Sequence, residues 1–228
     1  MQNVMITGAS KGIGKAIAQA LYTRYNLIVI DQETPTHTFF NHFYRCDLSQ
    51  SEAITETIRQ IKNDVTSLYG LINNVGMFIH KPLHEQTLRD WEKVIALNLT
   101  VPYLLSHAFA PLLTHGHIIN IASTRASMSE AGTEPYSASK GGLVALTHAL
   151  SISLAGKVSV NSISPGWINT DETYEPTKEE HAWHPSGRVG KTSDIAEFVR
   201  FLLEREDGFI TGSDFVVDGG VSKKMVYP

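Results

Sequence analysis

Short apolar runs alternate along the chain with longer stretches in which apolar residues recur at helical spacing. The runs predict strands buried on both faces, and the periodic stretches predict helices that cover them. The expected strands are Asn3–Thr7, Leu27–Ile30, Phe43–Cys46, Leu71–Gly76, His117–Ile121, Val158–Ile163 and Phe215–Gly220. The expected helices are Lys15–Tyr25, Gln50–Val65, Asp90–His115, Tyr136–Leu154 and Asp194–Leu203. This alternation predicts an α/β fold, a doubly wound parallel sheet of about seven strands in a single domain that covers residues 1–228.

Two parts of this pattern are irregular. The helical stretch Asp90–His115 is interrupted around Pro102, and Asn98 lies in its apolar face, where a polar side chain usually mends a backbone break or holds a water. Residues 170–190 are polar and too long for an ordinary connection, so we expect a lid over a pocket; the alternative is a fixed surface excursion. The residues expected to cap helices are Ser49 and Thr192.

Composition narrows the kind of partner. The 228 residues are 42% hydrophobic and 18% charged, enough for a sizeable core, and the net charge is −4. Because there is no basic excess, nucleic acid and anionic membranes are disfavoured as main partners, and small molecules are favoured. Cys46 is the single cysteine, which excludes an intrachain disulfide and a cluster of thiolate ligands. We expect no metal site, no membrane span and a cytoplasmic location.

The first expected strand runs into a glycine-rich turn, T-G-A-S-K-G-I-G, which opens a helix. Glycines let the backbone approach a pyrophosphate, and the helix N-terminus offers it free N–H groups and partial positive charge. The glycines are Gly8, Gly12 and Gly14, a spacing that differs from the commoner G-x-G-x-x-G. The alternative is a turn that only packs helix on strand, but the strand–turn–helix context favours dinucleotide binding.

Asp31 follows the second strand, where an acid in such a unit accepts hydrogen bonds from the adenosine ribose hydroxyls. A 2'-phosphate of charge about −2 at roughly 5 Å and a dielectric near 20 would be repelled by about 6 kcal/mol before screening. Lys11 in the glycine turn can reach a 2'-phosphate, but an exposed lysine contributes only about 1 kcal/mol. The sequence therefore favours NAD(H), with NADP(H) as the alternative; a solvated loop acid is the other interpretation of Asp31.

Polar residues also follow the third and fourth strands. Asp47 and Leu48 lie where the adenine ring of a dinucleotide would lie. Asn73 and Asn74 end the fourth strand, and a buried asparagine is costly unless it is hydrogen-bonded. We therefore expect these two side chains both to tie neighbouring strands together and to face a ligand.

The segment Y-S-A-S-K places Tyr136 and Lys140 one helical turn apart on the same face. Lowering a tyrosine pKa from about 10 to about 7–8 requires roughly 3–4 kcal/mol in favour of the phenolate. A cation about 5 Å away at an effective dielectric near 20 supplies roughly 3 kcal/mol. Tyr136 is thus a candidate acid/base, and Ser123 is a candidate to hold a carbonyl oxygen beside it. Most isolated Y-x-x-x-K matches are solvated helix faces, so this interpretation depends on the preceding motifs.

The chain resembles the short-chain dehydrogenase/reductase family from end to end. The resemblance rests on T-G-x-x-x-G-I-G, Asp31, Asp47-Leu48, N-N-V-G, Asn98, Ser123, Y-S-A-S-K, P-G-W-I-N-T and V-V-D-G-G. It implies a Rossmann-type domain in which Ser123 orients the substrate oxygen and Tyr136 transfers the proton. It also implies that Lys140 lowers the tyrosine pKa and holds the nicotinamide ribose, and that Asn98 keeps a proton-relay water.

The cofactor contacts that the resemblance implies come from the ends of several expected strands and from the helix that carries Tyr136. They are Gly8, Ser10, Lys11, Gly12, Ile13, Gly14, Asp31, Asp47, Leu48, Asn74, Gly76, Tyr136, Lys140, Pro165, Gly166, Ile168 and Thr170, the last at the nicotinamide carboxamide. Val75 stands where the family usually has alanine, a change that should leave binding intact.

We therefore expect an enzyme that moves a hydride between NAD(H) and a secondary alcohol or ketone. The motifs do not separate ketoacyl-carrier-protein reductases from sugar or polyol dehydrogenases, and an NADP(H)-preferring carbonyl or 3-oxoacyl reductase is the alternative. A non-catalytic dinucleotide sensor is the rival of another class, disfavoured because all four catalytic positions are filled. The resemblance also implies a homotetramer or homodimer.

Overall fold

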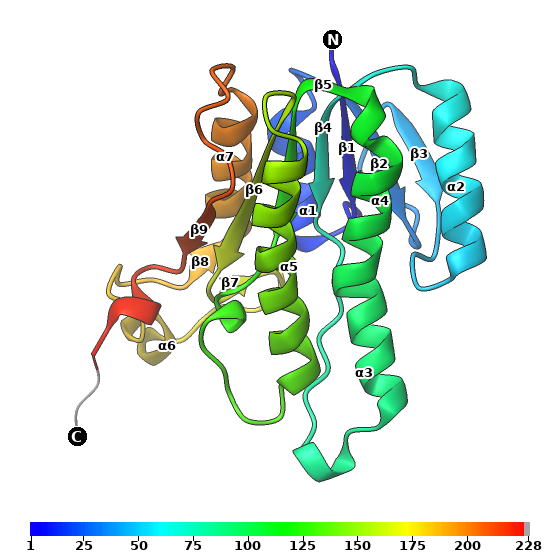
Figure 1. Cartoon of the computed structure of the whole chain (residues 1–228). Coiled ribbons are helices and arrows are strands. Elements are labelled where there is room, and N and C mark those ends of the chain that lie inside the picture. Colours follow the sequence, from blue (N-terminus) through cyan, green and yellow to red (C-terminus); the bar gives the residue numbers. More distant parts are fainter. Residues whose placement is uncertain (226–228) are drawn as a thin grey trace.

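The computed structural model, which describes residues 1–225, is built around one sheet of seven parallel strands (Figure 1). The strand order is β3-β2-β1-β4-β5-β6-β9. The strands are β1 (Asn3–Thr7), β2 (Asn26–Asp31), β3 (His42–Arg45), β4 (Leu68–Asn73), β5 (Leu113–Ile121), β6 (Val158–Pro165) and β9 (Asp214–Val217). The predicted doubly wound parallel sheet is confirmed. Two further short strands, β7 (Ile168–Asn169) and β8 (Gly190–Lys191), pair with each other outside it.

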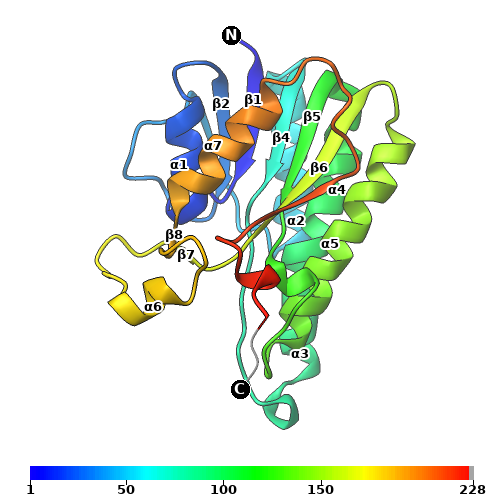
Figure 2. The same ribbon diagram turned by 90° about the vertical axis from the view of Figure 1, so that its left-hand side faces the viewer.

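Helices cover both faces of this sheet, as the turned view in Figure 2 shows. One face carries α1 (Gly12–Leu21) and α7 (Thr192–Leu203). The other carries α2 (Ser51–Asp64), α4 (Val101–Phe109) and α5 (Glu134–Ser153). The helix α3 (Leu88–Ile95) continues beyond the sheet beside α5, so the two form a wall below the carboxyl ends of the strands (Figure 1).

The strands are apolar throughout because both of their faces are buried. In β1, Val4 and Ile6 point into the core shared with α1 and α7, whereas Met5 points into the core shared with α2 and α4. All three side chains are fully buried. Full burial of such a side chain contributes about 1.5–3 kcal/mol, so the continuous apolar runs stabilise the sheet from both sides.

The order of the strands places a ligand site before any side chain is considered. The chain runs outward from β1 to β2 and β3, then returns to β4 on the other side of β1. In open parallel sheets, ligands bind outside the carboxyl ends of the strands where the order reverses. Here that point lies between the carboxyl ends of β1 and β4. The glycine turn follows β1, and Asn74 follows β4.

The helical stretch expected over Asp90–His115 differs in detail. It begins at Leu88, contains a π-turn at Ala96–Thr100 and ends at Leu112, and β5 starts at Leu113. The break therefore precedes Pro102. At this turn the Val101 N–H bonds the Ala96 carbonyl, five residues earlier. Pro102 follows directly and has no N–H to donate to the Asn98 carbonyl four residues earlier.

The same helix passes a simple test for a membrane span. Its 25 residues, Leu88–Leu112, reach a mean hydropathy of 1.3 over an 18-residue window. In this fold, however, Val101, Leu105 and Phe109 are buried against the sheet. The apolar face is that of a core helix.

Residues 170–190, where the sequence predicts a lid, contain secondary structure of their own. They contain a short helix, α6 (Lys178–Ala182), which begins at a capping box formed by Thr177 and Glu180, and they end at β8. The first part is exposed, whereas His184 and Val189 are buried. The caps predicted elsewhere are wrong. The N-cap positions of α2 and α7 are Gln50 and Lys191, one residue after Ser49 and one before Thr192.

Candidate active site

In the glycine turn at the carboxyl end of β1, the backbone of Gly14 packs directly against the backbone of Gly8. Gly8 has a φ of +69° and Gly12 a φ of +57°, in the left-handed region that favours glycine. A Cβ added at Gly14 would overlap the carbonyl of Gly8, and Asn74 Nδ2 donates to the carbonyls of Thr7 and Gly8 at 2.9 and 2.8 Å. No side chain other than hydrogen fits there. The turn therefore leaves a bare backbone surface at the start of α1, as pyrophosphate binding requires.

A groove runs from this turn along the strand ends. Its outer part is a cavity of about 730 Å³ lined by Asp31, Asp47 and Leu48 among others, and its inner part is a cavity of about 420 Å³. Gly76 and Met77 line both parts. A Cβ at Gly76 would lie 3.5 Å from Lys140 Nζ and from Asn98 Oδ1, so this backbone position lies in the groove beside both side chains. The residues expected to contact the cofactor that line the inner part are Ile13, Asn74, Gly76, Tyr136, Lys140, Pro165, Gly166, Ile168 and Thr170.

The two asparagines at the end of β4 have different roles: one ties neighbouring strands together, and the other lines the groove. Asn73 is buried and donates to Asn120 Oδ1 at 2.8 Å, tying β4 to β5. Asn74 lines the groove while it holds the glycine turn.

Asp31 is fixed at the outer end of the groove. One carboxylate oxygen accepts the Ser10 N–H at 2.9 Å and the other accepts the Glu33 N–H at 3.1 Å. Lys11, which was the argument for NADP(H), pairs instead with the Glu33 carboxylate at 3.1 Å. Sequence analysis missed Glu33, although its position two residues after Asp31 was a signal. Two acids therefore lie at this end, and the nearest lysine is engaged by one of them.

Ser123, Tyr136 and Lys140 meet in the inner part of the groove. Ser123 follows β5, and its buried side chain accepts the Arg125 N–H at 3.2 Å. Tyr136 and Lys140 lie one turn apart on α5, with Lys140 Nζ 5.6 Å from the centre of the tyrosine ring. Lys140 is 3% exposed and donates to the Ile121 carbonyl at 2.7 Å. The strand end and the helix thus supply two hydroxyls and one ammonium to a single cavity.

Burial dominates the electrostatics of this cluster, contrary to the expectation that Lys140 lowers the tyrosine pKa. Burial raises the pKa of Tyr136 above 10.0, against smaller lowering effects of a hydrogen bond with Ser123 and of the Arg125 charge. Burial also lowers the pKa of Lys140 from 10.5 to about 8. Each group is therefore biased toward its neutral form, because desolvation disfavours both charges. Such perturbed groups in a cleft mark a functional site.

Asn98 lies in the π-turn beside the lysine. Its fully buried side chain donates to the Met77 carbonyl at 2.9 Å and to Ser139 Oγ at 3.0 Å, and it accepts the Met77 N–H at 2.7 Å. The amide is thus occupied in fixing the segment after β4. Its backbone carbonyl lies four residues before Pro102, which has no N–H to donate to it.

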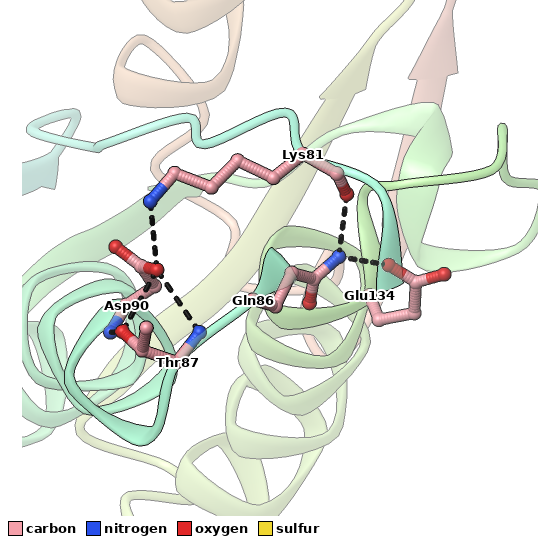
Figure 3. A network of polar contacts seen from close by, with 5 residues as sticks. All are labelled: Lys81, Gln86, Thr87, Asp90 and Glu134. Carbon is pink, nitrogen blue, oxygen red and sulfur yellow. Dashed lines mark hydrogen bonds and ion pairs between the residues drawn. The ribbon is translucent and has the colours of Figure 1, made fainter. Parts of the chain in front are cut away.

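A polar network holds the start of α5 in place, as Figure 3 shows. Gln86 Nε2 donates to the Lys81 carbonyl at 2.9 Å and to the Glu134 carboxylate. Lys81 Nζ in turn pairs with Asp90 at 2.8 Å, within the capping box that Asp90 forms with Thr87. The side chains of this network are only partly buried, so their contacts matter mainly for the geometry of the site. They connect the segment before α3 to the residue two positions before the candidate acid/base.

A second cavity, of about 550 Å³, opens beside Ser123 on the side away from the glycine turn. Arg125, Trp167 and Trp183 line it, and the two indole rings lie 5.8 Å apart. Phe78 packs edge-on against the Tyr136 ring at 5.0 Å. Sequence analysis did not single out Arg125 or Phe78, although both stand two residues from a motif residue, Ser123 and Gly76.

Comparisons with known proteins agree with this geometry. The family profile described as enoyl-(acyl carrier protein) reductase matches residues 8–222. An uncharacterized oxidoreductase of Thermotoga maritima is 40% identical over 98% of this chain and 96% of its own length. A 3-oxoacyl-(acyl-carrier-protein) reductase of Haemophilus influenzae is 32% identical over 95% and 96%.

Solved structures are similar over the same extent. An apo SCOR enzyme from Clostridium thermocellum has a TM-score of 0.91 and 34% identity over 99% of this chain and 95% of that one. A 4-hydroxyisoleucine dehydrogenase complexed with NADH has a TM-score of 0.90 and 31% identity over 99% and 100%.

Proposed function

The chain belongs to the short-chain dehydrogenase/reductase family of NAD(P)-dependent oxidoreductases, and on that premise we propose that it moves a hydride between NAD(H) and a secondary alcohol or ketone. Tyr136 is the general acid/base in this proposal. The observation that carries it is the meeting of Ser123, Tyr136 and the buried Lys140 in one cavity that continues the groove beside the glycine turn. We further propose that residues 1–228 form a single catalytic domain.

The groove fits a dinucleotide at each end. The bare backbone of Gly8 and Gly14 at the start of α1 suits the pyrophosphate, and Asp31 suits the ribose hydroxyls. Thr170 and Ile168 line the inner part of the groove, which supports their proposed contact with the nicotinamide. When bound, this group supplies the hydride that reduces a ketone or accepts the hydride from an alcohol.

The chain's own residues move the proton. In the reductive direction Ser123 Oγ donates a hydrogen bond to the substrate carbonyl oxygen, and Tyr136 gives its phenolic proton to that oxygen as it becomes an alcohol. The raised pKa of Tyr136 suits this step, because the phenol is protonated at neutral pH. The Lys140 ammonium compensates the phenolate that remains. A water on the Asn98 carbonyl would return the proton from solvent.

NAD(H) is the cofactor that the outer end favours. Asp31 and Glu33 both carry negative charge there, and Lys11 is paired with Glu33 rather than facing an open site. A 2'-phosphate would meet two carboxylates, each opposing it by several kcal/mol before screening.

The second candidate is an NADP(H)-dependent 3-oxoacyl reductase. The Haemophilus influenzae relative is named a 3-oxoacyl-(acyl-carrier-protein) reductase and aligns over nearly the whole chain, which is the observation in favour of this reaction. Against it stands the acidic outer end of the groove. A neighbour of 31% identity is a dehydrogenase complexed with NADH, which supports the first candidate.

Turnover of the purified protein tests the proposal. It is assayed with NAD(H) and NADP(H) on sugars, polyols, oxo acids, their esters and oxoacyl thioesters. Tyr136→Phe should lose nearly all turnover and keep NADH binding, since the ring shape is preserved and only the hydroxyl is lost. Ser123→Ala should lower kcat by about 10²–10³ without weakening NADH binding. Turnover by Tyr136→Phe close to that of the unaltered protein at every pH would refute the assigned role.

We also propose that the protein is a cytoplasmic homotetramer or homodimer. Apolar side chains on the outer helices support this: Trp91, Tyr103 and Ile152 are exposed. Sedimentation velocity of the protein at several concentrations measures the assembly state. A monomer at every concentration would exclude the proposal.

A further inference from the structure

The cavity beside Ser123 adjoins the reacting position but not the outer groove. Ser123, Gly166 and Trp167 line both this cavity and the inner groove. A molecule whose reacting carbon lies at Ser123 and Tyr136 therefore extends its remaining atoms into this space. The side chains that line this cavity therefore select the substrate.

Most of the wall is apolar and partly open. Trp167, Trp183 and Met128 are 38%, 52% and 43% exposed, although large apolar side chains are normally covered. They line the cavity together, so the body of the substrate that covers them is apolar.

One side chain in this wall is formally cationic. Arg125 is the single arginine or lysine among the described residues that line the cavity. Its side chain is 22% exposed and lies 5.9 Å from the centre of the Phe78 ring. Nη1 makes a long contact of 3.4 Å to Thr133 Oγ1. A guanidinium has five donors in a planar fork, and the strong partner here is Glu130 alone, at 2.7 Å.

That partner is readily replaced. The Glu130 side chain is 71% exposed, and ion pairs at such exposure contribute little to stability. A carboxylate that enters the cavity can therefore take its place on the fork, in the bidentate geometry that arginine favours.

The other acids of the cavity are already bonded within the chain. Glu180 accepts the Tyr174 hydroxyl at 2.7 Å and the Thr177 N–H at 2.7 Å. Asp218 accepts the N–H groups of Gly220 and Ser222 at 2.8 and 2.7 Å. Among the charges near the reacting hydroxyl, the one that acts on Tyr136 is Arg125. Both carboxylates keep their negative charge, so what distinguishes Arg125 is its place as the cation of this cavity nearest the reacting hydroxyl and not the net charge of the cavity.

We propose that Arg125 binds a carboxylate of the substrate, so that the protein acts on oxo acids and hydroxy acids with a short apolar body. The proposal rests on the function proposed above and assigns the substrate class of that site. Arg125 is its specificity-determining residue, and Trp167 and Trp183 cover the carbon chain between the carboxylate and the reacting carbon.

The test compares each acid with its neutral ester. The probes are α-, β- and γ-oxopentanoate and their methyl esters, with NADH, on the unaltered protein, Arg125→Gln, Arg125→Lys and, as the matched control, Glu130→Gln. A charge-assisted hydrogen bond corresponds to roughly 10- to 150-fold, so the best acid should exceed its ester by that factor in kcat/KM. Arg125→Gln should lose this acid-to-ester factor, whatever change in kcat/KM the acid and the ester share through Tyr136, and Arg125→Lys should retain part of the factor. Glu130→Gln should keep or raise kcat/KM for the acid.

Three results would overturn the proposal. Equal kcat/KM for acid and ester in the unaltered protein, or an equal loss on both in Arg125→Gln, would show that Arg125 acts on Tyr136 or on the fold. Turnover of esters, polyols or oxoacyl thioesters in preference to the acids would also remove it while leaving the oxidoreductase function intact. No turnover of any substrate by a protein that binds NADH would defeat the proposed function itself.

Discussion

Lys140 should make the folded protein less stable than a neutral side chain would, and Lys140→Met tests this directly. Burial lowers the pKa of Lys140 from 10.5 to about 8. That difference corresponds to about 3 kcal/mol of destabilisation while the ammonium is charged in both the folded and the unfolded chain. Methionine removes this cost, but it also removes the donor to the Ile121 carbonyl, a loss of about 1–3 kcal/mol. The net gain at neutral pH is on the order of 1 kcal/mol, or about 2–4 °C in Tm.

The sign of the pH dependence follows from the lowered pKa. Below about pH 8 the lysine is charged in both states and the full cost applies. Between pH 8 and 10.5 the unfolded chain binds more protons than the folded one, so the unaltered protein gains stability as pH rises. Lys140→Met lacks this gain. Its advantage at pH 7 should therefore shrink by about 1 kcal/mol at pH 9.

Urea unfolding at fixed protein concentration, at both pH values, measures the gap. Lys62→Met, which changes an exposed lysine of α2, is the control and should show no such change. The variant should also lose turnover, because Lys140 lies in the catalytic cavity. A Lys140→Met gap that stays constant between the two pH values, or a variant much less stable at pH 7, would refute the argument from burial.

Three further predictions concern Asp31, His117 and residues 170–176. Asp31→Ala should narrow or reverse the preference for NADH over NADPH in titrations that follow cofactor fluorescence; tighter NADPH binding by the unaltered protein would contradict the assignment. Burial lowers the pKa of His117 from 6.5 to about 4, so stability should fall as pH drops from 6.5 to 4, by up to about 3 kcal/mol, and His117→Phe should flatten this part of the urea profile; identical slopes would rule this out. Amides of residues 170–176 should exchange quickly with solvent and slow when NADH and a product analogue bind; strong protection in the free protein would exclude a lid.

Local features of the sequence predicted most of the fold and the core of the candidate site. Both faces of a parallel strand are buried, so the strands appeared as continuous apolar runs. The glycine turn and the Tyr136–Lys140 pair were equally visible, because backbone conformation and helical spacing depend on neighbours within a few residues. Asp31 was found from its distance after Gly14 along one βαβ unit. Element ends were less accurate, as Leu113 at the start of β5 shows.

Other properties were decided only by residues that meet across the fold. The pairing of Lys11 with Glu33 joins two turns, and it removes the support that Lys11 gave to NADP(H) as the cofactor. Arg125 lines the cavity beside Ser123 because η4 (Thr124–Ala126), α6 and the segment after β6 meet there. The raised pKa of Tyr136 depends on how much water the surrounding elements exclude, and the Coulomb argument from helical spacing omitted that cost. Spacing along the chain fixes which groups are neighbours, whereas desolvation and charge balance depend on the packed whole.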